Sequence, residues 1–166
     1  MDIIGEYLAL CWFDSSPLEM TRSTRFFKQN LLFHFVIVFF IQFNMTDDIE
    51  SVTEVIFEIV LSLGFIGLIL WFNDSMHAYV QVGSAVIFCQ NVLALFLVPI
   101  MFWATVAENW PSYTVLILVL VWNWLATAII FKKVLTVNIL AGLIVSLFYL
   151  LTSFGGGFAI NSFVSG

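Results

Sequence analysis

Apolar residues run through most of this chain in long blocks that are separated by short polar segments. A helix that rises about 1.5 Å per residue needs about 20 apolar residues to cross roughly 30 Å of bilayer hydrocarbon. The blocks have this length, so the expected fold is all-α, a polytopic membrane protein with five transmembrane helices. The spans are predicted at about residues 26–43, 52–72, 78–106, 113–131 and 137–154. Together they form a single transmembrane domain over residues 17–157.

Polar and special residues predict where these helices begin, bend and end. Ser16-Pro17-Leu18-Glu19 has a capping-box pattern, so the first long helix is expected to start there and to continue into the first span. Pro99 lies inside the third span and predicts a tilt or kink. Gly155-Gly156-Gly157 is expected to stop the last span, which leaves residues 158–166 as a short apolar tail.

Residues 1–16 precede the first span and predict a short helix followed by a turn at Asp14-Ser15-Ser16. This helix is too short to cross a bilayer, so we expect it to lie at the membrane interface. Its apolar side is predicted from residues at helical spacing, which are Ile3, Ile4, Tyr7, Leu8 and Cys11.

The composition fits this class, since 62% of the 166 residues are apolar, 10% are charged and the mean hydropathy is +1.08. A soluble domain has about 45–50% apolar and about 25% charged residues, so polar groups here are too few to cover a water-facing surface. Five basic residues also leave no nucleic-acid-binding surface. Cys11 and Cys89 are far apart in apolar surroundings and are interpreted as small buried side chains.

The basic residues fall into two clusters, at positions 22–28 and at Lys132-Lys133. With four crossings between them, both clusters lie on the same side of the membrane. The positive-inside rule then predicts a cytoplasmic N-terminus and a C-terminus on the opposite face.

His34 and Glu58 are the ionisable residues predicted to lie deepest in the membrane, where such groups are costly and often functional. The first two spans form an antiparallel hairpin, so the two side chains are expected at similar depth. The favoured interpretation is a hydrogen-bonded structural pair. A proton-accepting or ligand-binding site is an alternative, and a metal site is disfavoured because no further ligand has suitable spacing.

Other polar and aromatic side chains lie at membrane depth. The amides Gln90, Asn91, Asn123 and Asn138 are predicted to make interhelical hydrogen bonds, with a polar cavity as the alternative. Trp122 and Trp124 in the fourth span form a candidate partner interface, although lipid-facing bulk explains them as well.

The sequence contains no recognisable catalytic or cofactor motif. A phosphate-binding glycine loop, an HExxH motif, a CxxCH motif and a Ser/His/Asp set are all missing. We therefore expect no enzymatic activity, no cofactor and no metal.

The chain resembles the small five-span proteins of the Yip1-like group, particularly short bacterial members that are largely uncharacterised. The resemblance lies in Ser16–Glu19 before the first span, in Phe88–Pro99 of the third span, and in Trp122 and Trp124 followed by a basic turn. It implies a five-span fold and carries over no functional residue. Together with the short loops and acidic N-terminus, it leads us to expect a bacterial inner-membrane protein with a periplasmic C-terminus.

Two functions are compatible with these features. The leading hypothesis is a non-catalytic accessory or scaffold subunit that packs against larger membrane proteins. It would be part of a hetero-oligomer in lipid, such as a respiratory, oxidase, secretion or transport assembly. The alternative is a small transporter or proton-conducting component that uses His34 and Glu58.

Overall fold

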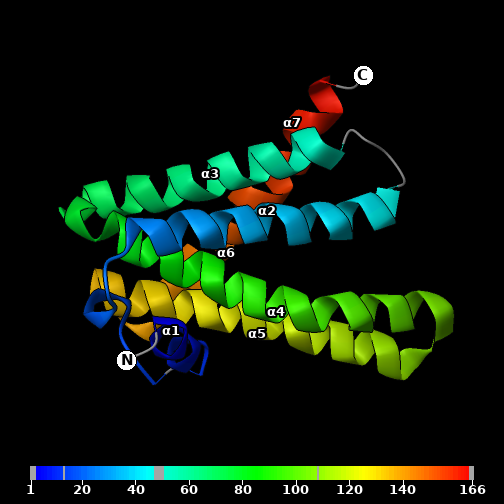
Figure 1. Cartoon of the computed structure of the whole chain (residues 1–166), viewed down its shortest axis with the longest axis horizontal. Helices are drawn as coiled ribbons and strands as arrows, with labels where there is room; N and C mark the ends of the chain where they lie inside the picture. The colour runs from blue at the N-terminus through cyan, green and yellow to red at the C-terminus, as the bar shows by residue number, and fades with distance from the viewer. Residues whose placement is uncertain (1–2, 13, 47–50, 108, 165–166) are drawn as a thin grey trace.

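The computed structural model describes residues 3–12, 14–46, 51–107 and 109–164, and this part of the chain is helical without strands (Figure 1). The helices are α1 (Ile3–Cys11), α2 (Thr24–Thr46), α3 (Ser51–Phe72), α4 (Tyr79–Ala107), α5 (Trp110–Leu135), α6 (Ile139–Leu150) and α7 (Gly156–Val164). Two 3₁₀ turns, η1 (Pro17–Glu19) and η2 (Met76–Ala78), precede α2 and α4, and a π-helical turn, η3 (Leu151–Gly155), joins α6 to α7.

Five helical segments within the described residues are long and apolar enough to cross a membrane. They are Thr24–Asn44, Ser51–Phe72, Met76–Ala107, Trp110–Leu135 and Ile139–Ile160. The predicted all-α, five-span fold with a short additional N-terminal helix is therefore confirmed.

The glycines at positions 155–157 do not end the last helix, contrary to the sequence prediction. The chain passes through η3 into α7, which continues to Val164. A Cβ atom on Gly157 would lie 3.3 Å from the backbone nitrogen of Glu58 and 3.4 Å from the carbonyl oxygen of Glu54. Gly157 therefore allows α7 to approach the backbone of α3 closely, and residues 158–164 of the predicted tail belong to a helix that contacts α3.

The first long helix, however, begins later than the Ser16 capping pattern predicts. Residues 17–19 form only the η1 turn, in which the Ser16 side chain makes no capping hydrogen bond. The α2 helix starts at Thr24, and the Ser23 hydroxyl accepts a hydrogen bond of 3.2 Å from the backbone nitrogen of Phe26. Gln81 of α4 donates to the carbonyl oxygen of Met20 at 2.8 Å, which holds the connecting segment in an extended form.

The α1 helix packs against α4 with a face that matches the predicted apolar side only in part. Tyr7, Leu10 and Cys11 are buried, whereas Ile4 and Leu8 are exposed. The Tyr7 ring stacks on Phe26 of α2 with the ring centroids 4.8 Å apart, and burial raises the pKa of its phenol. Since the exposed side of α1 is also apolar, lipid is a suitable surrounding for it.

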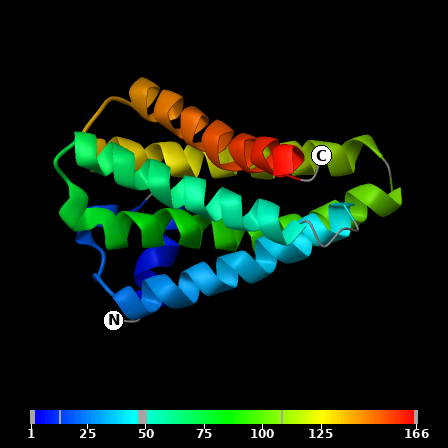
Figure 2. The same cartoon turned by 90° about the horizontal axis from the view of Figure 1, so that it is seen from above.

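The α4 helix lies at the centre of the bundle and contacts α1, α2, α3 and α5. A large apolar core forms where these helices meet α6, and a smaller cluster joins α2, α3 and α4. In Figure 1 the α4–α5 hairpin diverges from α2 and α3 toward the C-terminal end of α2, while Figure 2 shows α6 and α7 running along the other side of α3. This divergence separates the walls of the cavity described below.

Replacing Gly142, which lies at the α5–α6 contact, should destabilise the protein. A Cβ there would lie 2.7 Å from the carbonyl oxygen of Ala128, a backbone atom that cannot rotate away. Gly142→Val should therefore lower the free energy of unfolding by about 1–3 kcal/mol, the usual cost of overpacking. Reversible unfolding in detergent measures this loss. Gly64→Val is the matched control because nothing lies within 4 Å of its Cβ position, and an equal loss in both variants would contradict the close-contact explanation.

Candidate functional site

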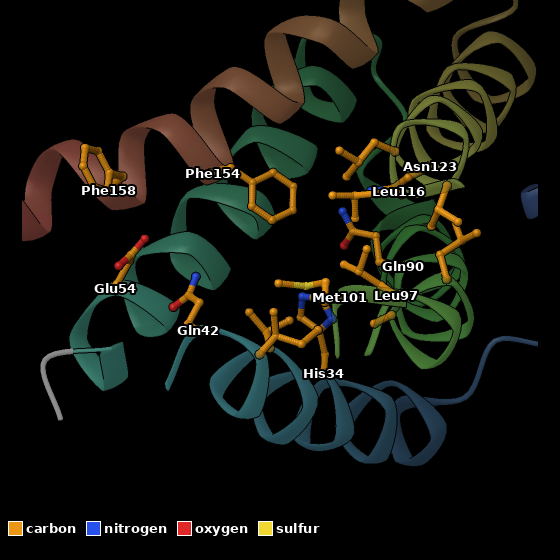
Figure 3. A pocket seen from close by; sticks show the side chains of 16 residues that line it. His34, Gln42, Glu54, Gln90, Leu97, Met101, Leu116, Asn123, Phe154 and Phe158 are labelled. Carbon is orange, nitrogen blue, oxygen red and sulfur yellow. The ribbon is translucent and has the colours of Figure 1, made fainter. Parts of the chain in front are cut away.

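A cavity of about 480 Å³ lies between the diverging parts of the bundle (Figure 3). This volume falls within the range of about 300–1,000 Å³ that is typical of small-molecule sites. Side chains from α2, α3, α4, α5, η3 and α7 line it. They are His34, Val38, Ile41, Gln42, Glu54, Gln90, Leu93, Ala94, Leu97, Met101, Leu116, Val119, Leu120, Asn123, Phe154 and Phe158.

Polar groups of the cavity wall gather toward its two ends, with apolar side chains between them. Gln42 and Glu54 lie near the end of the α2–α3 hairpin, since Glu54 is in the first turn of α3. His34, Gln90 and Asn123 come from the middle of α2, α4 and α5. Figure 3 shows Glu54 and Gln42 separated from Gln90 and Asn123. The cavity therefore extends from one end of the bundle to its middle and has an amphipathic lining.

One polar network fixes His34 at the inner end of this cavity. Its Nδ1 atom lies 2.8 Å from the Asn91 side-chain oxygen, and the Asn91 amide nitrogen donates to the side-chain oxygen of Asn30 at 2.8 Å. Asn30 in turn donates to the carbonyl oxygen of Ser84 at 3.0 Å. Because the Asn91 oxygen can only accept, His34 Nδ1 is the donor, and Nε2 of the neutral ring is left as an acceptor.

A second network begins at the neighbouring residue of α4. The Gln90 amide nitrogen donates to the Tyr149 hydroxyl at 3.1 Å, and this hydroxyl lies 2.5 Å from the hydroxyl of Ser62. Tyr149 is completely buried. The Gln90–Asn91 dipeptide thus joins α4 to α2 on one side and to α3 and α6 on the other.

Glu58 is 3% exposed and accepts a hydrogen bond of 3.0 Å from the Gln42 amide nitrogen. His34 and Glu58 make no hydrogen bond to each other in the described part of the chain, since each has its own amide partner. His34 lines the cavity, and Glu58 is hydrogen-bonded to Gln42, which also lines it.

The other candidate residues have different surroundings. The side-chain oxygen of Asn123 is buried and has no hydrogen-bond partner among the described residues. Asn138 caps the N-terminus of α6 by accepting from the backbone nitrogen of Ala141 at 2.8 Å. Trp124 donates to the carbonyl oxygen of Leu143 at 3.1 Å, and the Trp122 ring meets that of Trp12 edge to face with centroids 5.6 Å apart. Both tryptophans therefore have contacts within the chain.

Several network residues were not predicted from the sequence, namely Asn30, Ser62, Ser84 and Tyr149. A usable signal exists for two of them. Asn30 precedes His34 by four positions and Ser62 follows Glu58 by four positions, so each polar pair shares one face of its helix. Two polar residues at this spacing inside an apolar span indicate a buried polar face rather than an isolated group.

Comparison with known proteins gives no relative from which a role could be transferred: no family model, no curated protein and no solved structure matches this chain. Any functional inference must therefore rest on the cavity and its contacts.

The Tyr149 hydroxyl should contribute measurably to stability because it connects α3, α4 and α6. Tyr149→Phe removes both of its side-chain hydrogen bonds, each worth about 0.6 kcal/mol on average in membrane proteins. We expect a loss of about 1 kcal/mol in the free energy of unfolding in detergent, allowing for the unpaired Gln90 and Ser62. Tyr113→Phe, at an exposed position of α5, is the control. Equal stability of the two variants would show that the network adds nothing.

Proposed function

We propose that this protein is a small membrane carrier that binds a lipophilic molecule bearing a hydroxyl or amine donor in the cavity between α2, α4, α5 and α7. The observation that carries this proposal is the buried Asn123 oxygen without a partner at the inner end of an otherwise largely apolar cavity. It develops the transporter hypothesis drawn from the sequence, with the cavity rather than a His34–Glu58 pair as its basis.

The inner end of the cavity offers hydrogen-bond acceptors. Asn123 lines this end, and a rotation of its side-chain amide would bring its buried oxygen to a ligand. The Nδ1 atom of His34 is held by Asn91, which leaves Nε2 as the acceptor of this ring. A buried acceptor without a partner costs about 1–3 kcal/mol. A ligand that brings a hydroxyl or N–H group to this place recovers that energy, whereas a purely apolar molecule of the same size does not.

The polar networks support carriage rather than simple storage. His34 and Gln90 line the cavity, and the same side chains bind Asn91 and Tyr149. These contacts close the inner end. Release toward the other face of the membrane therefore requires them to exchange partners, and a bound hydroxyl or amine is a suitable substitute partner.

The accessory-subunit hypothesis is the second candidate, and the broad exposed aromatic surface favours it. Phe72, Phe102 and Trp110 are all strongly exposed. Such side chains face either lipid or the helices of a partner. Purification in mild detergent distinguishes the cases: stoichiometric membrane proteins that co-purify support a subunit, and a lone monomer counts against it.

We further propose an orientation with the N-terminus in the cytoplasm of a bacterial cell and the C-terminus in the periplasm, because Arg22, Arg25, Lys28, Lys132 and Lys133 then share the cytoplasmic face. Alkaline phosphatase, which is active only in the periplasm, should be active when attached after residue 166 and inactive when inserted after Thr136. The reverse pattern would refute this orientation.

The ligand class can be tested with two probes that differ in one hydrogen-bond donor, a photoactivatable analogue of dodecanol and its methyl ether. The alcohol should bind about tenfold more tightly, since about 1.4 kcal/mol for one hydrogen bond to a buried acceptor corresponds to this factor. Binding is measured by photolabelling of purified protein, with the labelled peptides identified by mass spectrometry. Label is expected on the cavity segments, for example near Met101 and Phe154.

Asn123→Leu should weaken the preference for the alcohol while retaining binding of the ether, since His34 Nε2 is then the remaining acceptor. Thr127→Val is the matched control, because Thr127 lies one turn further along α5, does not line the cavity and donates its hydroxyl to the Asn123 carbonyl oxygen. Equal affinity of the wild type for both probes, or label outside the cavity, would refute the proposed function.

A further inference from the structure

The structure brings together Cys11 of α1 and Cys89 of α4, which are 78 positions apart in the chain. Their sulfur atoms are 3.0 Å apart, and both thiols are free. The two residues are 5% and 1% exposed. The sequence predicted two separate buried side chains, whereas the structure places a dithiol at the contact between the N-terminal helix and the central helix.

An apolar groove of about 280 Å³ lies beside this dithiol, and Leu93 and Val119 line both this groove and the proposed carrier cavity. Cys11 lines it and Cys89 does not. Its other walls are the Trp12 and Trp122 rings and apolar side chains of α4 and α5. Phe96 and Leu118 are 58% and 61% exposed, so the groove opens on the apolar outer surface of the bundle.

The lining restricts the reagents that can reach Cys11. Charged, water-soluble thiol reagents such as glutathione disulfide would lose their hydration in a groove without polar side chains. A quinone dissolved in the membrane has the required properties: it is lipophilic and planar, and it accepts two electrons and two protons. The Trp12 and Trp122 rings, with centroids 5.6 Å apart, offer aromatic surfaces to its ring.

We propose that Cys11 and Cys89 form a redox-active dithiol that a membrane-soluble quinone, bound in the Trp12–Trp122 groove, oxidises to a disulfide. This inference is independent of the proposed carrier function, because the groove and the cavity bind different molecules and the test below uses no carrier ligand.

Cys11 is the residue that attacks the quinone, since it lines the groove. The thiolate is the reactive form of cysteine. The hydrogen bond with Cys89 lowers the pKa of the Cys11 thiol, because the Cys89 S–H group can donate to a Cys11 thiolate. Cys89, behind it, is placed to complete the reaction.

The reaction balances in two steps. The Cys11 thiolate adds to a ring carbon of the quinone and forms a carbon–sulfur bond, while one quinone oxygen takes up a proton. The Cys89 thiolate then attacks the Cys11 sulfur, the carbon–sulfur bond breaks with its electron pair returning to the ring, and the second oxygen is protonated. Two thiols and one quinone thus become one disulfide and one quinol.

The test uses the full chain, purified in detergent and fully reduced without oxygen, with menadione as the quinone. We expect one quinol to form per protein. Neither cysteine should then react with a maleimide mass tag, and mass spectrometry should find a Cys11–Cys89 disulfide. If the wild type keeps both thiols with menadione but loses them with the small oxidant diamide, the quinone site is refuted. If neither reagent forms the disulfide, the dithiol itself is refuted.

Single variants separate the roles of the two thiols. Cys89→Ala should stop at a covalent menadione adduct on Cys11, and Cys11→Ala should leave Cys89 unmodified. Adducts of equal yield on both variants would contradict the ordered mechanism.

Trp122→Ala should slow oxidation by menadione about tenfold without changing oxidation by diamide, since a lost aromatic contact of about 1.5 kcal/mol corresponds to this factor. Trp110→Ala is the matched control, because Trp110 is 82% exposed and lies outside the groove. Equal menadione rates in these two variants would refute binding of the quinone in the groove.

Discussion

Hydrocarbon offers no hydrogen bonds, so every polar group within a bilayer-spanning bundle must find its partner inside the protein. In this chain two neighbouring residues of α4 supply many of these partners. Asn91 binds His34 and Asn30 of α2, and Gln90 binds Tyr149 of α6, whose hydroxyl also meets Ser62 of α3. Because adjacent residues of a helix point in different directions, one short polar segment joins helices on separate sides. The packing of the α2–α3 hairpin against α4 and α6 depends on this junction.

The same constraint gives the cavity its chemical character. The buried Asn123 oxygen is one of a few buried polar atoms that the described residues leave without a hydrogen bond, and Asn123 also lines the cavity. Hydrophobic walls alone would not distinguish a ligand from the surrounding lipid. An acceptor at the end of an apolar cavity does, because only a molecule with a suitably placed donor gains from leaving the lipid for the protein.

The spans could be predicted from sequence because membrane thickness acts on each segment separately. Contacts between segments could not, because they depend on how each helix is rotated about its axis. Hairpin geometry indicates similar depth for His34 and Glu58, but rotation gives each a different amide partner. The glycines at 155–157 predicted a helix end because glycine destabilises helices in water-soluble proteins. In apolar surroundings no water competes for the backbone, and Gly157 instead provides a close contact with α3. Cys11 and Cys89 carried no pairing signal, since α1 docks on α4 through tertiary packing alone.

The docking of α1 has a consequence for the order of events during biosynthesis. This helix is the first part of the described chain to leave the ribosome. Tyr7 contacts Phe26 of α2, which follows directly, but other contacts are with segments made much later. Cys11 meets Cys89 of α4, and Trp12 meets Trp122 of α5. The carbonyl oxygen of Ser15, just beyond α1, accepts from Lys133 at the end of α5 at 2.7 Å. At about 5–20 residues per second, α1 waits for seconds before its binding surface exists. Its apolar outer face, suited to lipid, allows it to wait at the membrane surface until α5 has been inserted.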